Sequence, residues 1–439
     1  MTQETYSIEW KTKPLGSVCR FAGGYGFPDK YQGALDGDIL FIKVSDMSLP
    51  RNERYIVTAN NYVSSHLARS LGWKPFPSGS IVFAKVGAAL KLNKRRILTQ
   101  PTLIDNNMMA AIPSSELDGG FLFHFLTSLD FADFAQEGAL PSVNQKQIES
   151  IALPDISETE QSRIAEVLNA ADAAIQRTNT LINKLKWMKA GLLGDLLTRG
   201  LDRDGKLRDP ILHPEQFKDS PLGLIPKEWE VEPLKQALDF IDAGKSPTCL
   251  SRAAAAGEWG VLKVSAIRPE GFRPHENKAV INPLHINEAY EVKDGDLLIS
   301  RANTYELVGL TCLVRNPPSQ LMLCDKTLRL NVNKVRALSE FLFHVTQTPF
   351  VRSQIEIDAT GSSGSMKNIS QETIENLCIP LPELNEQEMI AGVLNIHDSH
   401  VRAEEANRAK LIQIKRGLMH DLLTGRVRVP ATKSEVVAV

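Results

Sequence analysis

A long amphipathic stretch occurs twice in this chain, and the repeat constrains the fold more than any other feature. Residues 160–198 align with residues 386–424 without a gap, and 17 of the 39 positions are identical. In the first copy, apolar residues recur at alternating steps of three and four, which predicts a helix packed along one seam. At about 1.5 Å per residue, such a helix is roughly 60 Å long. Ser157 and Glu160 have capping-box spacing at its start, and Gly200 stands where a terminating glycine is expected.

The repeat extends beyond the two helices. FLFH occurs at residues 121 and 341, and KVS occurs at residues 43 and 263. The chain is therefore predicted to contain two copies of one unit, a divergent globular domain followed by a long helix. The predicted division is 1–156, first globular domain; 157–200, first long helix; 201–384, connector and second globular domain; 385–426, second long helix; and 427–439, tail.

Each globular domain is predicted to mix short strands with helices. Strand patterns bounded by turn residues cover 37–47, 79–87 and 148–154 in the first domain, and 259–267, 294–301 and 327–333 in the second. Residues 119–134 and 339–355 have helical spacing. The connector, residues 200–229, is rich in proline, glycine and aspartate and lacks periodicity, which predicts an extended segment.

An antiparallel pairing of the two long helices is the simplest arrangement if a two-fold axis relates the repeats. The expected fold class is therefore α+β, with two pseudo-symmetric α+β domains separated by a long antiparallel two-helix coiled coil. The residues expected along the coiled-coil seam, or in contact with a partner, are Ile164, Leu168, Ile175, Ile182, Leu185, Leu192, Leu196, Leu394, Leu411, Leu418 and Leu422.

Composition limits the function classes only weakly. The hydrophobic fraction of 43% and charged fraction of 23% are typical of globular proteins, and a net charge of −2 neither favours nor excludes nucleic acid. The five cysteines are scattered without C-x-x-C spacing, which indicates reduced thiols rather than a disulfide frame or a zinc site. No apolar run approaches membrane-spanning length, so a cytoplasmic location is expected.

Several strings resemble catalytic motifs without their essential residues. Gly244-Lys245-Ser246 resembles the end of a phosphate loop, but Asp239 stands where the earlier glycine is required and Pro247 follows. Residues 316–319, NPPS, lack the aromatic residue with which adenine methyltransferases stack a flipped base. The two histidines of residues 397–400, HDSH, have no further ligands nearby. No catalytic residue, metal site or bound cofactor is therefore predicted.

Basic and polar residues in the loops of both domains are the remaining candidates for a binding function. Arg, Lys and Asn pair with phosphate oxygens and with base edges in the major groove. Each one alone is most often a solvated surface charge. The candidate DNA-binding residues are Lys43, Lys85, Lys91, Lys94, Arg95, Arg96, Lys245, Lys263, Arg268, Arg273, Arg301, Asn303, Ser362, Ser363 and Lys367.

The chain resembles the specificity (S) subunits of type I restriction-modification systems over essentially its whole length. The resemblance is carried by GLIPKEWEVEPL, DAGKSPT, GDLLISRAN, GSSGSMKNISQETIENLCIPLPELNEQEMIAGVLN and GLMHDLLTGRVRV, with GLLGDLLTRG matching the last of these. The first half is a looser match, with AGGYGFP in the glycine-loop position and GALPSVNQKQIESIALPDISETEQ before the first helix.

The resemblance implies a non-catalytic, DNA-reading chain. Each globular domain would be a target recognition domain reading one half of a bipartite, asymmetric DNA site, and the two long helices would form the spacer. The partners implied are double-stranded DNA, two methyltransferase subunits and, in some systems, two restriction subunits. S-adenosylmethionine, ATP and magnesium would then bind to the partner subunits and not to this chain.

Two other function classes remain open at this point. A self-contained DNA adenine methyltransferase would bind S-adenosylmethionine as an isolated chain. A coiled-coil interaction protein would bind no duplex DNA at low salt, even with its partners.

Overall fold

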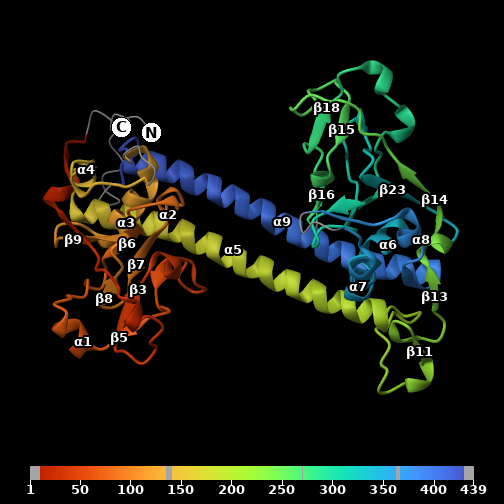
Figure 1. Ribbon diagram of the computed structural model, residues 1–439, viewed down its shortest axis with the longest axis horizontal. Coiled ribbons are helices and arrows are strands. Elements are labelled where there is room, and N and C mark those ends of the chain that lie inside the picture. Colours follow the sequence, from red (N-terminus) through yellow and green to blue (C-terminus); the bar gives the residue numbers. More distant parts are fainter. Residues whose placement is uncertain (1–9, 135–140, 269, 362–365, 430–439) are drawn as a thin grey trace, which may run out of the picture. The chain divides into compact units, whose positions relative to one another are not determined.

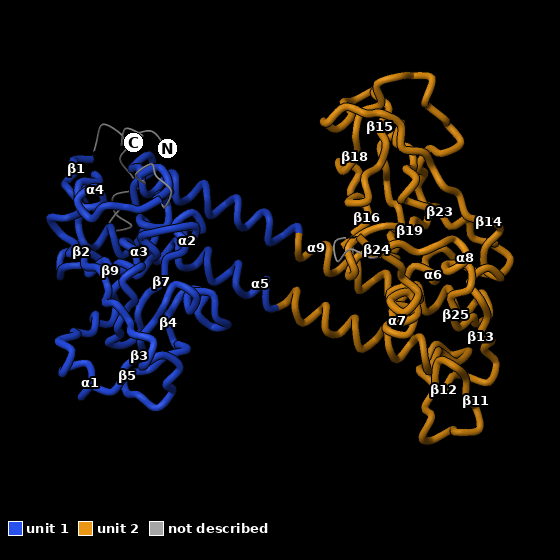
Figure 2. The backbone as a smooth tube through the Cα atoms, in the orientation of Figure 1, with its two compact units in different colours: residues 1–180, 406–439 blue, residues 181–405 orange. Residues whose placement is uncertain are grey.

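The computed structural model describes residues 10–134, 141–268, 270–361 and 366–429. The chain forms two compact units, and two long helices contribute to both (Figure 1, Figure 2). Unit 1 contains residues 1–180 and 406–439, and unit 2 contains residues 181–405. The long helices are α5 (Glu158–Thr198) and α9 (Leu384–Leu423), the second starting one residue before the predicted boundary. Among the described residues, no helix is long and apolar enough to span a membrane.

Unit 1 is built around a five-stranded sheet of order β2-β9-β6-β7-β4 and a three-stranded sheet of order β5-β3-β8. A further pair, β1 with β10, lies next to the start of α5 in sequence. The strands are β1 (Thr12–Pro14), β2 (Cys19–Gly23), β3 (Ile39–Ile42), β4 (Tyr55–Ile56), β5 (Tyr62–Val63), β6 (Ile81–Ala84), β7 (Arg95–Leu98), β8 (Thr102–Ile104), β9 (Met108–Pro113) and β10 (Ala152–Pro154). The short helices are α1 (Ser65–Ser70), α2 (Ala88–Lys91), α3 (Gly119–Ser128) and α4 (Gln145–Glu149).

Unit 2 has a four-stranded sheet of order β14-β23-β19-β21 and a three-stranded sheet of order β18-β15-β22. Two-stranded pairs are β11-β12, β13-β25, β16-β17 and β20-β24. The strands are β11 (Phe217–Ser220), β12 (Gly223–Pro226), β13 (Glu230–Pro233), β14 (Leu238–Ala243), β15 (Gly260–Leu262), β16 (Ile267–Arg268), β17 (Gly271–Phe272), β18 (Asn277–Ala279), β19 (Leu297–Ser300), β20 (Ala302–Asn303), β21 (Thr311–Leu313), β22 (Leu321–Met322), β23 (Thr327–Val332), β24 (Lys367–Asn368) and β25 (Cys378–Leu381). The helices are α6 (Ser339–Val345), α7 (Pro349–Asp358) and α8 (Gln371–Glu375).

The two units share one topology, as the sequence repeat predicts. The order β2-β9-β6-β7 in unit 1 matches β14-β23-β19-β21 in unit 2, and these neighbouring strands are antiparallel in both. In each three-stranded sheet one pair is parallel, β3 with β8 and β15 with β22. The predicted class of two pseudo-symmetric α+β domains with paired long helices is therefore confirmed. The predicted domain boundaries themselves stay a prediction.

Several local predictions were wrong: the helix expected over 119–134 ends at Ser128, and three further differences have an identifiable reason. The helix expected over 339–355 is two helices, because Pro349 lacks the N–H that a continuous helix needs and instead starts α7. The strand expected from residue 148 begins at Ala152, because the residues up to Glu149 belong to the short helix α4, which Asn144 caps. The connector is not simply extended, since residues 217–226 form the hairpin β11-β12.

Within each unit, segments of α5 and α9 run antiparallel. In unit 1, Asp172 Oδ1 pairs with Lys415 Nζ at 2.5 Å and Asn179 Oδ1 accepts from Arg408 at 3.4 Å. In unit 2, Lys189 Nζ lies 2.6 Å from Asp398 Oδ1 and Lys186 Nζ lies 2.7 Å from Glu405 Oε1. Rising numbers on one helix meet falling numbers on the other, which is antiparallel pairing.

The predicted seam residues are buried unequally. Ile164, Leu168 and Leu422 lie in the core of unit 1, and Leu196 and Leu394 lie in the core of unit 2. Ile182 is also buried, and the half-buried members are Ile175, Leu185, Leu192, Leu411 and Leu418. Apart from Ile182, the buried seam positions lie where the helices also pack into the core of a globular domain.

A glutamine repeated in the two helices fastens each helix to its domain. Gln161 accepts a hydrogen bond from the backbone N–H of Asp118 at 2.8 Å and donates to Ile156 O at 3.1 Å. Gln387 accepts from Leu338 N at 3.0 Å and donates to Pro382 O at 2.8 Å. Both glutamines are buried, so these bonds satisfy backbone groups that water does not reach.

A glutamate directly precedes each of these glutamines, Glu160 in unit 1 and Glu386 in unit 2, and its hydrogen-bond partners differ between the units. Glu386 accepts from Leu201 N at 2.8 Å, from Trp229 Nε1 at 3.0 Å and from Arg208 at 2.5 Å. A Cβ on Gly200 would lie 2.3 Å from Glu386 Oε1, so only glycine fits, at φ +65°. Glu160 accepts two hydrogen bonds from Arg428, at 2.7 and 2.8 Å. The predicted cap at Ser157 is present, since its Oγ accepts from Glu160 N at 3.3 Å.

A buried histidine faces the helix pair in each unit. His124 Nε2 lies 2.9 Å from Asn169 Oδ1, and His344 Nε2 lies 3.1 Å from Asn395 Oδ1. The pKa of each histidine is lowered to about 4, mainly by burial, and a nearby lysine, Lys415 or Lys189, contributes to the lowering. Both rings are therefore neutral at pH 7.

These histidines predict a stability loss in mild acid. The unfolded pKa is about 6.5, so the unfolded chain binds more protons between about pH 6.5 and pH 4, and stability falls as the pH falls through that window. The expected loss is on the order of 3 kcal/mol per histidine. Urea unfolding of wild type and His344→Gln at pH 7 and pH 4.5 measures it, with hydrogen exchange reporting on unit 2. An equal loss of stability in the two proteins would contradict the assignment to His344.

Candidate nucleic-acid interface

A basic residue directly follows a central strand of the main sheet at the same position in both units. The end of the sheet at which these strands finish is called the sheet edge below. Lys85 follows β6, donates its N–H to Asn107 O at 2.9 Å and accepts from Val143 N at 2.9 Å. Arg301 follows β19, donates its N–H to Lys326 O at 2.8 Å and accepts from Ile369 N at 3.0 Å. The backbone pattern is the same, so Lys85 and Arg301 occupy equivalent positions.

A glycine-containing loop packs against this edge in both units. A Cβ on Gly24 would lie 2.1 Å from Ile104 O, and a Cβ on Gly244 would lie 2.2 Å from Leu323 O. These distances are shorter than any real contact, so only glycine allows the loop to approach the neighbouring strand so closely. The next residue in unit 2 is the exposed Lys245. The glycine loop of the sequence pattern therefore presents a basic side chain beside Arg301.

Four predicted residues of unit 2 gather at this edge. The pairing of β20 with β24 places Asn303 opposite Lys367, and Arg301 immediately precedes β20. Ser246 Oγ donates to Asp325, which brings Lys245 to the turn that also holds the backbone of Arg301. Ser362 and Ser363, predicted next to this cluster, lie outside the described residues.

The other candidates in unit 2 lie around β16 and β17. Lys263 forms an ion pair with Glu276 at 3.4 Å, and Arg273 forms one with Glu270 at 3.2 Å. The Nε of Arg268 is buried and has no hydrogen-bond partner among the described residues. The structure therefore divides the unit 2 candidates into the sheet-edge group and this second group.

The remaining candidates of unit 1 are mostly held by intramolecular hydrogen bonds. Lys43 Nζ donates to Gln32 Oε1 at 2.6 Å, and Lys94 Nζ donates to Ser48 Oγ at 2.7 Å. Arg96 is half-buried and donates to Met47 O at 2.8 Å. Lys91 is exposed on α2.

Arg95 is not available as a DNA contact. It is 3% exposed and its guanidinium lies 3.8 Å from the centre of the Phe131 ring. It donates to Leu126 O at 3.2 Å and to Asn93 Oδ1 at 2.7 Å, and burial lowers its pKa to about 9. Its run of basic neighbours suggested a surface patch, but alternation along β7 turns this side chain into the core.

Sequence reasoning missed the turn that completes the sheet edge. It contains Asp105 and Asn107 in unit 1 and Asp325 and Lys326 in unit 2. Asp105 Oδ1 accepts from both the N–H and the Nδ2 of Asn107, at 2.8 and 2.7 Å. The shift of 220 residues between the two aspartates equals that of the KVS and FLFH matches, and this signal could have located the turn.

No metal-binding cluster accompanies this edge in the part of the chain that the structure describes. The described residues contain no group of three or more His, Cys, Asp or Glu side chains placed to hold a metal ion. Buried thiols such as Cys19 and Cys312 have pKa values raised to about 12 by burial, so they are protonated and unreactive at neutral pH.

The repeated domain has a clear match among known proteins. A family model described as the type I restriction modification DNA specificity domain matches residues 7–187 and 226–414, most of the chain and both repeats. The chain belongs to this family. The resemblance to specificity subunits is thereby confirmed, and the family is defined by DNA specificity rather than by catalysis, as predicted for this chain.

Individual relatives agree with the family assignment. The specificity subunit of type I restriction enzyme EcoEI from Escherichia coli is 31% identical over 183 residues, which are 42% of this chain and 31% of that protein. That of MjaVIII from Methanocaldococcus jannaschii is 26% identical over 299 residues, 66% of this chain and 65% of that protein. The alignments therefore span less than two thirds of either relative.

A solved structure shares the fold. The crystal structure of the S subunit of a type I restriction-modification system from M. genitalium aligns with a TM-score of 0.57 and 12% sequence identity, covering 96% of this chain and 98% of that one. Because the family model matches once in each repeat, this specificity chain has two target recognition domains.

Proposed function

We propose that this specificity subunit reads a bipartite, asymmetric DNA sequence, one half-site with each recognition domain. The observation that carries the proposal is the equivalent placement of Lys85 and Arg301 at the end of the central strand in two domains of one topology. The surroundings of the two residues differ, with Lys245 and Lys367 present only in unit 2. Because the domains have diverged, the half-sites they read should differ.

The two kinds of DNA contact would have separate roles. Lys and Arg contacts to phosphates would position each domain and make binding salt-dependent, and base-edge contacts would select the sequence. The long helices would set the number of unread base pairs between the half-sites, because each helix runs from one unit into the other.

The partners follow from the same proposal. The chain would act as the scaffold for two methyltransferase subunits and, in systems that have them, two restriction subunits. S-adenosylmethionine, ATP and magnesium would bind to those subunits. The specificity subunit would contribute recognition and spacing and no reacting group.

Lengthening the helices tests the proposal. Inserting four alanines after Ala174 and four after Gln413 adds about one turn, roughly 6 Å, to each helix at positions that face each other. The expected result is an unread gap longer by about two base pairs, or loss of binding, with both half-site sequences unchanged. Selection of bound sites from random duplex DNA by the assembled complex measures both features.

An insertion into α5 alone is the matched control. It shifts the register of the antiparallel pair and should destabilise the chain instead of moving the half-sites. A change in the half-site sequences themselves after the double insertion would show that recognition and spacing are not separate.

A further inference from the structure

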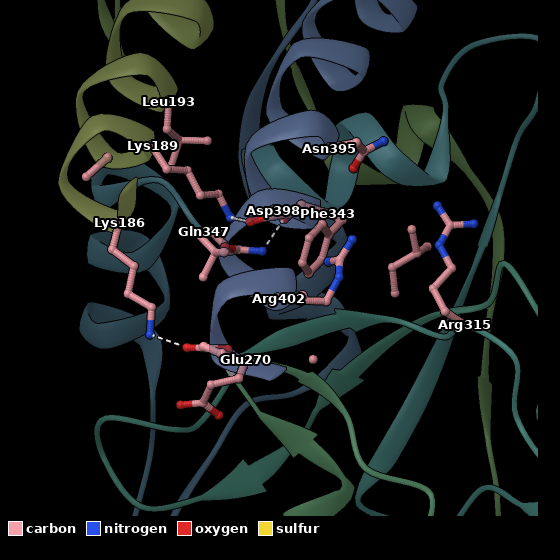
Figure 3. Close-up of a pocket in the computed structure, with 15 residues that line it drawn as sticks. Lys186, Lys189, Leu193, Glu270, Arg315, Phe343, Gln347, Asn395, Asp398 and Arg402 are labelled. Carbon is pink, nitrogen blue, oxygen red and sulfur yellow. Dashed lines mark hydrogen bonds and ion pairs between the residues drawn. The ribbon is translucent and has the colours of Figure 1, made fainter. Parts of the chain in front are cut away.

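A cavity of about 470 Å³ lies within unit 2, between the long helices and the recognition domain (Figure 3). Its walls include Phe343 of α6, Asn395 and Asp398 of α9, Lys189 of α5, and Glu270 next to β17. None of the predicted DNA-binding residues, Arg301 included, is among the residues that line it.

The equivalent place in unit 1 is filled by an arginine side chain. The guanidinium of Arg54 lies 4.9 Å from the centre of the Phe123 ring. It donates to Asn169 Oδ1 and lies 3.6 Å from Asp172 Oδ2. An aromatic face, a carboxamide oxygen and a carboxylate therefore hold this guanidinium together.

The same three groups recur in the walls of the unit 2 cavity. Phe343 matches Phe123 at the shift of 220 residues, and Asn395 and Asp398 match Asn169 and Asp172 at the shift of 226. The neighbouring ion pair also recurs, with Lys189 on Asp398 Oδ1 and Lys415 on Asp172 Oδ1. The oxygen that faces Arg54 in unit 1 is Oδ2, and among the described residues nothing is bonded to Oδ2 of Asp398.

Unit 2 has an acidic residue where unit 1 has the arginine. Arg54 directly precedes β4, which pairs with β7, and Glu270 directly precedes β17, which lies beside the matching strand β21. Glu270 lines the cavity and is paired with Arg273 outside it. Unit 2 therefore keeps the groups that receive a guanidinium and adds the Glu270 carboxylate, while the two arginines of its wall, Arg315 and Arg402, come from other positions in the chain.

We propose that this cavity receives the guanidinium of an arginine side chain from a protein that binds unit 2. Three cations of the wall, Lys186, Lys189 and Arg315, are already paired with carboxylates, which leaves the second carboxylate oxygen of Asp398 for a further cation. Arginine fits better than lysine, because its planar fork stacks on a ring and bonds two acceptors at once. The proposal concerns protein binding and does not rest on the DNA-reading function.

A residue of the chain itself could compete for the site. Arg402 stands one helical turn after Asp398, lines the cavity and is exposed, and Figure 3 shows it beside Phe343. Its counterpart in unit 1 is Gln176. The variant Arg402→Gln therefore reproduces the unit 1 helix surface and removes the competitor.

The direct test is calorimetric titration of the full chain and of Arg402→Gln with the acetylated, amidated tripeptide Ala-Arg-Ala. The matched probes are the same tripeptide with lysine, and with citrulline, which keeps the shape of arginine without its charge. The expected result is saturable binding at least about fivefold tighter for arginine than for either control, and tighter in Arg402→Gln than in wild type. Equal binding of the arginine and citrulline peptides would overturn the proposal.

A second variant checks that binding occurs in this cavity. Glu270→Arg places an arginine where unit 1 has Arg54, so it should raise the thermal midpoint above that of Glu270→Lys and abolish binding of the arginine peptide. Persistent peptide binding in Glu270→Arg would show that the peptide binds elsewhere. Stabilisation by Glu270→Arg without any peptide binding to wild type or Arg402→Gln would show that the cavity accepts only an arginine of its own chain, and would also overturn the proposal.

Discussion

Replacing Glu386 with alanine should destabilise unit 2 by about 3–5 kcal/mol, the usual cost of removing one partner from a buried ion pair. The carboxylate bonds Leu201 N, Trp229 Nε1 and Arg208, and the side chains of Glu386 and Arg208 are 10% and 9% exposed. Without the carboxylate, two buried N–H groups lose their acceptor, and the buried Arg208 keeps only the exposed carboxylate of Glu228, 3.2 Å away. Urea unfolding followed by hydrogen exchange in β13 and the first turns of α9 measures the loss.

The repeat provides the matched control for this substitution. Glu160→Ala in unit 1 removes the acceptor of Arg428, whose side chain is 48% exposed and can be solvated instead. Its expected cost is about 1 kcal/mol, confined to unit 1. Equal losses from the two substitutions would mean that burial of the Glu386 network does not set its strength.

Arg301→Ala and Lys85→Ala should each impair the reading of one half-site only, a different one in each variant. Arg301 is exposed at the sheet edge of unit 2, and Lys85 holds the equivalent position in unit 1. Loss of a base-contacting side chain costs about 1–3 kcal/mol, or roughly 5- to 150-fold in affinity, and relaxes specificity at the contacted position. Competition binding to duplexes altered in one half-site at a time measures this discrimination.

The control for this pair is Lys227→Ala, which removes an exposed lysine near the hairpin β11-β12 and away from the sheet edge. It should leave discrimination at both half-sites unchanged. If Arg301→Ala weakened discrimination at both half-sites equally, the assignment of one half-site to each domain would be wrong.

The sequence predicted the repeat-level architecture because the repeat carries it. A long helix is recognisable from the periodicity of its apolar residues, so α5 and α9 were predictable. A duplicated pattern implies a duplicated domain, so the class of the two domains was predictable as well. The positions at which shorter helices end were less predictable. Pro349 divides a helix that its flanking apolar spacing had suggested was continuous.

The candidate site was predictable only in part, because the side-chain direction of a strand residue depends on register. Arg301 and Lys85 follow strands whose ends are recognisable, and they lie at the sheet edge. Arg95 belongs to the same basic run as Lys94 but points into the core, which composition does not reveal. The cavity of unit 2 required the structure, since it depends on what Arg54 does in unit 1.

The most direct test of the central claim is a methylome. The chain would be expressed with its methyltransferase subunits in cells that lack other adenine methylation, and methylated adenines would be mapped across the genome. Two different short half-sites separated by a fixed number of unread base pairs are expected, with one half-site degenerate in Arg301→Ala and the other in Lys85→Ala. A single contiguous methylated motif would contradict reading by two domains.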